Sequence, residues 1–237
     1  MSANSLRACV DVLTSPASAF DSIKSNNHKW LVPFLLVTGS IAALFLYYFS
    51  AVDFAWLKEG IVDQMALNGD LNEDELAAAS QFISSTSMLW SSLIGGIVAV
   101  IVMNAILALY LNIVTKSSGV GDYSYGTWFG FSWWVGMPHV VAALLSMLMV
   151  LFSGDGMVAL EDLSVTTLNS LIFNVDMTSP WFSFLSAFDL LMLWSIGLIA
   201  IGLKSWVGFD MSKASKIAIA PYALLYGIWA LMVVFSA

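Results

Sequence analysis

The chain has 237 residues, of which 59% are hydrophobic and only 10% are charged. A soluble domain carries about 25% charged residues, so this composition indicates an integral membrane protein whose first partner is the lipid bilayer. The formal net charge of -8 argues against nucleic acid as a partner, because nucleic-acid-binding proteins carry basic patches. The single cysteine, Cys9, excludes an internal disulfide framework.

The first part of the chain is mixed and mildly amphipathic, and we predict a cytoplasmic amphipathic N-terminal segment over residues 1–29. Apolar residues at helical spacing predict a short helix over 5–13. Ser15 followed by Pro16 is typical of a helix start, so a second short helix is expected over 16–24. The pair would lie on the membrane surface. The alternative is a loosely ordered tail.

Long apolar segments dominate the remainder of the chain. Segments of about 20 residues or more can cross the bilayer core of roughly 30 Å. The predicted spans cover about 30–49, 88–114, 127–152, 181–203 and 214–235. We therefore predict an all-α membrane protein, with one five-helix transmembrane domain over residues 30–237.

Basic residues set the predicted orientation of the spans, because cytoplasmic loops carry an excess of Lys and Arg. Seven of the eight basic residues fall on one side of the five-span arrangement: Arg7, Lys24, Lys29, Lys116, Lys204, Lys213 and Lys216. This pattern predicts a cytoplasmic N-terminus and an external C-terminus. The acidic stretches 50–87 and 153–180 then become external loops. Within the first loop, Asn72 and the acids after it indicate a capped, solvent-exposed helix.

Three polar residues lie well inside predicted spans: Asn104, His139 and Asp189. An ionisable group at membrane depth is costly, so this set is a candidate intramembrane polar site. Asp189 lies about eight residues into the fourth predicted span, at a depth that would let it meet His139. The alternative is that each residue only hydrogen-bonds a neighbouring helix, which is worth about 0.6–2 kcal/mol.

The remaining motifs give little sign of chemistry. The sequence lacks the HExxH, GxSxG, P-loop and Cys/His patterns of hydrolases, nucleotide-binding proteins and metal proteins. We therefore expect no enzyme activity, no cofactor and no metal site. Pro138 should kink or notch the third span, because proline removes a backbone hydrogen bond.

Several short motifs together resemble the Yip1 domain family, in its bacterial members. They are the stretch LTSPASAF followed by WLVP, the stretch GDYSY leading to a proline, and the stretch FDLLMLW. The residues that carry the resemblance are Pro16, Phe20, Pro33, Tyr123, Tyr125, Pro138 and Trp194. The resemblance covers roughly residues 10–230. The order of the motifs along the five predicted spans supports it.

The resemblance implies a multi-pass protein of the bacterial inner membrane. Eukaryotic relatives are associated with small GTPases, vesicle traffic and membrane shaping, machinery that a bacterial cell lacks. We therefore expect a non-enzymatic protein that organises the membrane or binds a protein or lipid partner. The sequence leaves open whether the protein forms a homo-oligomer. The alternative is a transporter, channel or lipid-moving protein that uses Asp189, with His139 and Asn104 nearby.

Overall fold

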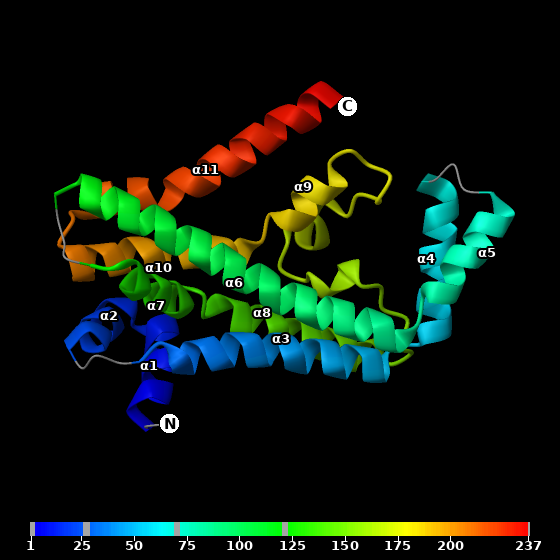
Figure 1. The fold of residues 1–237 in the computed structure, drawn as a ribbon, viewed down its shortest axis with the longest axis horizontal. Helices are drawn as coiled ribbons and strands as arrows, with labels where there is room; N and C mark the ends of the chain where they lie inside the picture. The colour runs from blue at the N-terminus through cyan, green and yellow to red at the C-terminus, as the bar shows by residue number, and fades with distance from the viewer. Residues whose placement is uncertain (1–2, 26–28, 69–71, 120–122, 237) are drawn as a thin grey trace.

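The computed structural model describes residues 3–25, 29–68, 72–119 and 123–236, and most of them are helical (Figure 1). Five helical segments are long and apolar enough to cross a membrane: Leu31–Ala51, Ser85–Ser117, Tyr125–Ser153, Leu190–Val207 and Met211–Phe235. The predicted all-α architecture with five spans is therefore confirmed. The orientation of the termini stays a prediction.

The spans are α3 (Leu31–Ala51), α6 (Ser85–Ser117), α7 (Tyr125–Val135) with α8 (Pro138–Ser153), α10 (Leu190–Val207) and α11 (Met211–Ser236). Helix α3 packs along α6 and α8, while α10 packs on α11 and against α7 and α8. Helix α11 starts beside α10 and then diverges from the other spans (Figure 1).

We call the two ends of the bundle the basic end and the acidic end. The basic end is where α6 and α10 finish and α11 begins, and it carries Lys116, Lys204, Lys213 and Lys216. The acidic end carries α4 (Phe54–Asn68), α5 (Glu73–Phe82) and the loop 154–181. Helix α5 has the predicted cap: the Asn72 side chain accepts a hydrogen bond from the Glu75 amide at 2.9 Å, and Glu75 accepts one from the Asn72 amide at 3.0 Å.

The third span is broken as Pro138 predicts. Helix α7 ends at Val135, and Pro138 opens α8 at a position where its missing N–H costs little. Proline cannot donate to the carbonyl of Trp134, and the Met137 amide donates to it instead, at 3.4 Å. The break therefore leaves this buried carbonyl with a partner.

The fourth span is shorter than the expected segment 181–203. A separate short helix, α9 (Phe182–Ala187), comes first, and the chain is extended at Phe188 and Asp189 before α10 begins. Backbone hydrogen bonds of 2.9 Å from Leu190 to Thr166 and from Leu168 to Phe188 replace helical ones there. Hydropathy misses the break because both sides of it are apolar. Asp189 therefore lies at the start of a span instead of inside one.

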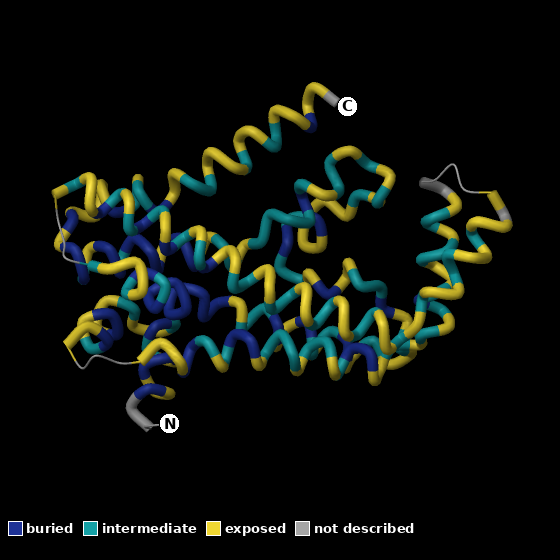
Figure 2. The backbone as a smooth tube through the Cα atoms, viewed as in Figure 1, coloured by how far each residue is buried: buried dark blue, intermediate teal, exposed yellow. Residues whose placement is uncertain are grey.

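The larger of two hydrophobic clusters in the described residues lies at the basic end, where buried residues gather around α7 and α10 (Figure 2). Phe131 is fully buried there, with ring centroids 5.4 Å from Phe20, 5.4 Å from Trp128 and 4.9 Å from Trp206. Such aromatic contacts add about 0.5–1.5 kcal/mol each beyond the burial of apolar area. This cluster joins the N-terminal segment to two membrane spans.

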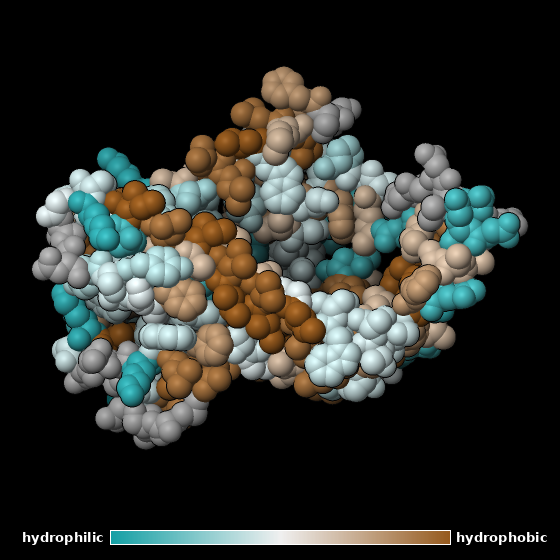
Figure 3. All heavy atoms as spheres, in the orientation of Figure 1, coloured by the Kyte–Doolittle hydropathy of each residue, from teal (hydrophilic) through white to brown (hydrophobic). Residues whose placement is uncertain are grey.

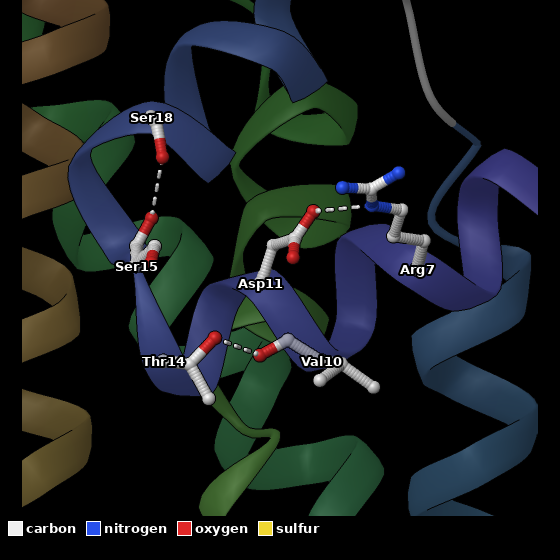
Figure 4. Close-up of polar contacts among 6 residues, drawn as sticks. All are labelled: Arg7, Val10, Asp11, Thr14, Ser15 and Ser18. Atoms are coloured by element: carbon white, nitrogen blue, oxygen red, sulfur yellow. Dashed lines mark hydrogen bonds and ion pairs between the residues drawn. The ribbon is translucent and has the colours of Figure 1, made fainter.

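The two predicted N-terminal helices form, as α1 (Ala3–Thr14) and α2 (Pro16–Ser25). Their apolar faces turn towards the bundle and bury Cys9, Val12 and Phe20. Their outer side is mixed: Arg7 lies 3.8 Å from Asp11, the Thr14 hydroxyl donates to the Val10 carbonyl at 3.1 Å, and the side chains of Leu6 and Val10 are exposed (Figure 4). The segment is therefore packed onto the protein, and its main apolar face is not free to lie in lipid.

Candidate functional site

A pocket of about 710 Å³ lies between α6, the α7–α8 junction, α10 and α11. Most of its lining is apolar. The polar residues of the lining are Asn104, Tyr110, Ser132, His139, Asp189, Ser195, Tyr222 and Tyr226. The structure thus brings the three residues of the sequence-based candidate site to one pocket, although they come from three different spans.

The mouth of the pocket faces the side of the bundle. Its rims are α6, with Met103 and Ile106, and α11, with Leu224, Leu225 and Ile228, and these five side chains are all at least half exposed. Figure 3 shows apolar surface along α6 and along α11, on either side of a hollow. In a protein with five spans, large exposed apolar rims of this kind face acyl chains. The pocket therefore opens sideways, towards lipid.

One hydrogen bond closes the pocket towards the basic end. Pro221 lies inside α11 and cannot donate to the carbonyl of Ile217 one turn earlier. The Tyr110 hydroxyl of α6 donates to that carbonyl at 2.8 Å. The proline thus creates the acceptor that ties α6 to α11. A proline inside an apolar segment is the signal in the sequence that could have predicted this bond.

An aromatic cluster closes the pocket towards the acidic end. The Tyr226 hydroxyl donates to the carbonyl of Ala187, the last residue of α9, at 2.7 Å. The rings of Phe184, Phe188 and Trp229 lie 5.1–6.2 Å from the Tyr226 ring, measured between centroids. These contacts hold α9 against the diverging part of α11, so the pocket has a wall at this end as well.

Asp189 has a structural role at the edge of this pocket. It is the N-cap of α10: one carboxylate oxygen accepts a hydrogen bond from the Leu191 amide at 2.7 Å. The other oxygen accepts from the Thr166 hydroxyl at 2.9 Å. An ionised carboxylate offers about four acceptor positions, so these two bonds leave capacity for a ligand.

His139 lies in the first turn of α8 and is exposed. Its Nδ1 lies 2.9 Å from the carbonyl oxygen of Gly136. A carbonyl only accepts, so Nδ1 carries the proton and donates, and Nε2 is left as an acceptor when the ring is neutral. No hydrogen bond or ion pair joins His139 to Asp189 among the described residues. The two side chains line the same pocket but are not bonded to each other in the described structure.

Asn104 and Ser195 supply the deeper polar groups of the pocket. Asn104 is 8% exposed, and its amide nitrogen donates to the Val100 carbonyl of its own helix at 3.0 Å. It makes no hydrogen bond to a neighbouring helix within the described part of the chain. Ser195 is 6% exposed, and its hydroxyl has no hydrogen-bond partner there. Sequence reasoning missed Ser195, because a lone serine in an apolar helix carries no signal.

Some family-like residues build the packing at the basic end. The carbonyl of Trp206, in the last turn of α10, accepts hydrogen bonds from the Tyr123 hydroxyl and from Lys24 Nζ, the latter at 2.9 Å. The indole N–H of Trp206 donates to the Phe20 carbonyl at 3.0 Å. Helix ends leave carbonyls without partners, so these groups cap α10 and dock α2 onto it.

The other family-like residues shape the spans. Pro16 and Pro138 each begin a helix, and Pro33 is buried in the first turn of α3. The ring of Tyr125 stacks 6.3 Å from that of Phe129, and Trp194 is 36% exposed on the outer face of α10. The described residues contain no cluster of His, Cys, Asp or Glu that could hold a metal ion.

Comparison with protein families identifies the chain. The model described as Yip1 domain matches residues 10–232, nearly its whole length. Comparison with curated proteins gave no match, and comparison with solved structures gave none. The matched residues include the end of α1, all of α2 to α10 and most of α11. The chain belongs to the Yip1 domain family.

Proposed function

We propose that this protein is a non-enzymatic membrane protein that binds a membrane lipid in the pocket between α6, α8, α10 and α11. One observation carries the proposal: an apolar pocket of about 710 Å³ opens sideways and is lined by Ser195, whose buried hydroxyl has no hydrogen-bond partner among the described residues. A buried polar group without a hydrogen bond is costly, so a ligand that satisfies it gains affinity. We also propose that the protein lies in a bacterial inner membrane with its N-terminus in the cytoplasm.

A lipid fits this pocket better than a water-soluble molecule does. The exposed side chains of both rims are apolar, so a polar solute would have to cross acyl chains to reach the mouth. An amphiphile in the bilayer already has its acyl chains at the rims. The small number of polar groups in the lining would fix its position, as in other apolar ligand sites.

A transporter or lipid-moving protein is the second candidate, because Asp189 lines the same pocket with unused acceptor capacity. Acids that line a pocket between membrane spans mark substrate or ion pathways in such proteins. It predicts flux of a solute or lipid in liposomes containing the protein, and loss of that flux in Asp189→Asn. Absence of flux across a broad panel of substrates would leave lipid binding without transport.

The test of lipid binding is native mass spectrometry of the protein after gentle extraction in detergent. We expect one lipid retained per protein chain. Ser195→Phe fills the pocket and should release that lipid. Gly197→Phe is the matched control, because Gly197 lies on the same helix and a side chain there meets open space. Equal lipid retention in the two variants would contradict the proposal.

A further inference from the structure

Two ionisable side chains other than tyrosine line the pocket, Asp189 and His139, and neither Lys nor Arg is among the described residues of the lining. While Nδ1 of His139 donates to the Gly136 carbonyl and Nε2 carries no proton, the carboxylate of Asp189 is the full charge there. The start of α10 contributes a partial positive charge of about half an elementary charge, which the full charge of the carboxylate outweighs. The rings of Tyr222 and Tyr226 also line the pocket, and aromatic faces attract cations. This end of the pocket therefore favours an ammonium group and disfavours an additional anion.

The polar groups of the pocket lie at two levels. Asp189 stands at the start of α10, and Ser195 lies six residues further along it, which is about 9 Å at the rise of an α-helix. Asn104 and Ser195 lie 13 and 12 residues before the ends of their helices, so each is about 18–20 Å from the basic end. At this deeper level the hydroxyl of Ser195 and the second amide N–H of Asn104 have no acceptor within the described part of the chain.

Because the proposed function places a lipid here, these two levels define its class. We infer that the pocket binds a glycerophospholipid with a primary ammonium headgroup, of the ethanolamine type. The ammonium donates to Asp189, and the ester carbonyls accept from Ser195 and Asn104. The acyl chains then run towards Tyr110 at the basic end, along the apolar part of the lining. The phosphate joins the ammonium group to the glycerol, so it lies between these two levels.

The test compares lipids on delipidated protein. Phosphatidylethanolamine, phosphatidylcholine and phosphatidylglycerol with identical acyl chains are titrated separately, and adducts are counted by native mass spectrometry. We expect phosphatidylethanolamine to bind about tenfold more tightly than phosphatidylglycerol, the effect of one charge-assisted hydrogen bond. Phosphatidylcholine should fall between them, because its ammonium is cationic but has no N–H to donate.

Two variants separate headgroup recognition from lipid binding as such. Asp189→Asn keeps an N-cap of similar shape. Lipid should still bind to this variant, but the ratio of affinities for phosphatidylethanolamine and phosphatidylglycerol should fall to about one. Asp155→Asn is the matched control, because Asp155 also accepts from a backbone amide, that of Met157, but does not line the pocket. An unchanged preference in Asp189→Asn, or equal binding of the three lipids by the wild type, would overturn the inference alone. Absence of any lipid adduct would overturn the proposed function as well.

Discussion

Gly202 gives the sharpest test of the packing between α2, α7 and α10. A Cβ atom added at Gly202 would lie 2.4 Å from Cε2 and Cζ of the Phe131 ring. Carbon atoms in contact normally lie about 3.5–4.0 Å apart, so Gly202→Ala requires the ring to move by roughly 1 Å or more. Phe131 is fully buried against Phe20, Trp128 and Trp206, so it cannot move alone. Overpacking of this kind costs about 1–3 kcal/mol.

Gly197→Ala is the matched substitution on the same helix. A Cβ at Gly197 meets nothing within 4 Å. Both substitutions gain about 0.8–1 kcal/mol of intrinsic helix propensity, so this gain cancels when the two variants are compared. We expect Gly202→Ala to be less stable than Gly197→Ala by about 1–3 kcal/mol. Thermal unfolding in detergent, followed by tryptophan fluorescence, measures the difference. Equal melting temperatures for the two variants would refute the described packing.

Three further predictions concern the N-terminal segment and the acidic end. Burial raises the pKa of the Cys9 thiol to about 12, so native protein at pH 8 should resist maleimide, while protein unfolded in SDS should react. Lys24→Met removes the hydrogen bond to the Trp206 carbonyl, which should lower the free energy needed to detach α2 by about 1 kcal/mol. Proteolysis of α2 should therefore become faster. Asn72→Ala removes the side-chain bond of the capping box and keeps the backbone N–H that donates to Glu75. It should cost about 1 kcal/mol, seen as faster hydrogen exchange confined to α5.

Each of these predictions has an outcome that would contradict it. Rapid alkylation of native Cys9 at pH 8 would mean that the thiol is accessible. Lys29→Met, which removes the same charge five residues later, should leave proteolysis of α2 unchanged; an equal effect would assign the result to charge alone. A lower melting temperature of the whole bundle in Asn72→Ala would contradict the separation of α5 from the spans.

The five spans could be predicted because each is a long apolar segment with a polar stretch or a basic loop beside it. The start of α2 at Pro16, the break at Pro138 and the cap at Asn72 could be predicted too, because each depends on local backbone chemistry. The break before α10 could not. It depends on pairing of Phe188 and Leu190 with the loop at 166–168, which are contacts between distant parts of the chain.

The candidate site was predictable only in part. Asn104, His139 and Asp189 are polar residues in apolar segments, so they can be recognised in the sequence, and all three line the pocket. The expected approach of His139 to Asp189 required the packing of spans, which composition does not encode. Ser195 and Tyr226 could not be identified because serine and tyrosine are ordinary residues of membrane helices. Their importance comes from the pocket itself.

The most direct test of the account is to locate a lipid in the pocket. The protein is reconstituted in vesicles that contain phosphatidylethanolamine with a photoreactive diazirine in one acyl chain, and adducts are mapped by mass spectrometry after irradiation. We predict adducts on Tyr110 and on Ile199, which lines the pocket and is 1% exposed. Adducts confined to outward-facing residues such as Val98 and Leu144 would contradict the claim that the pocket holds a lipid.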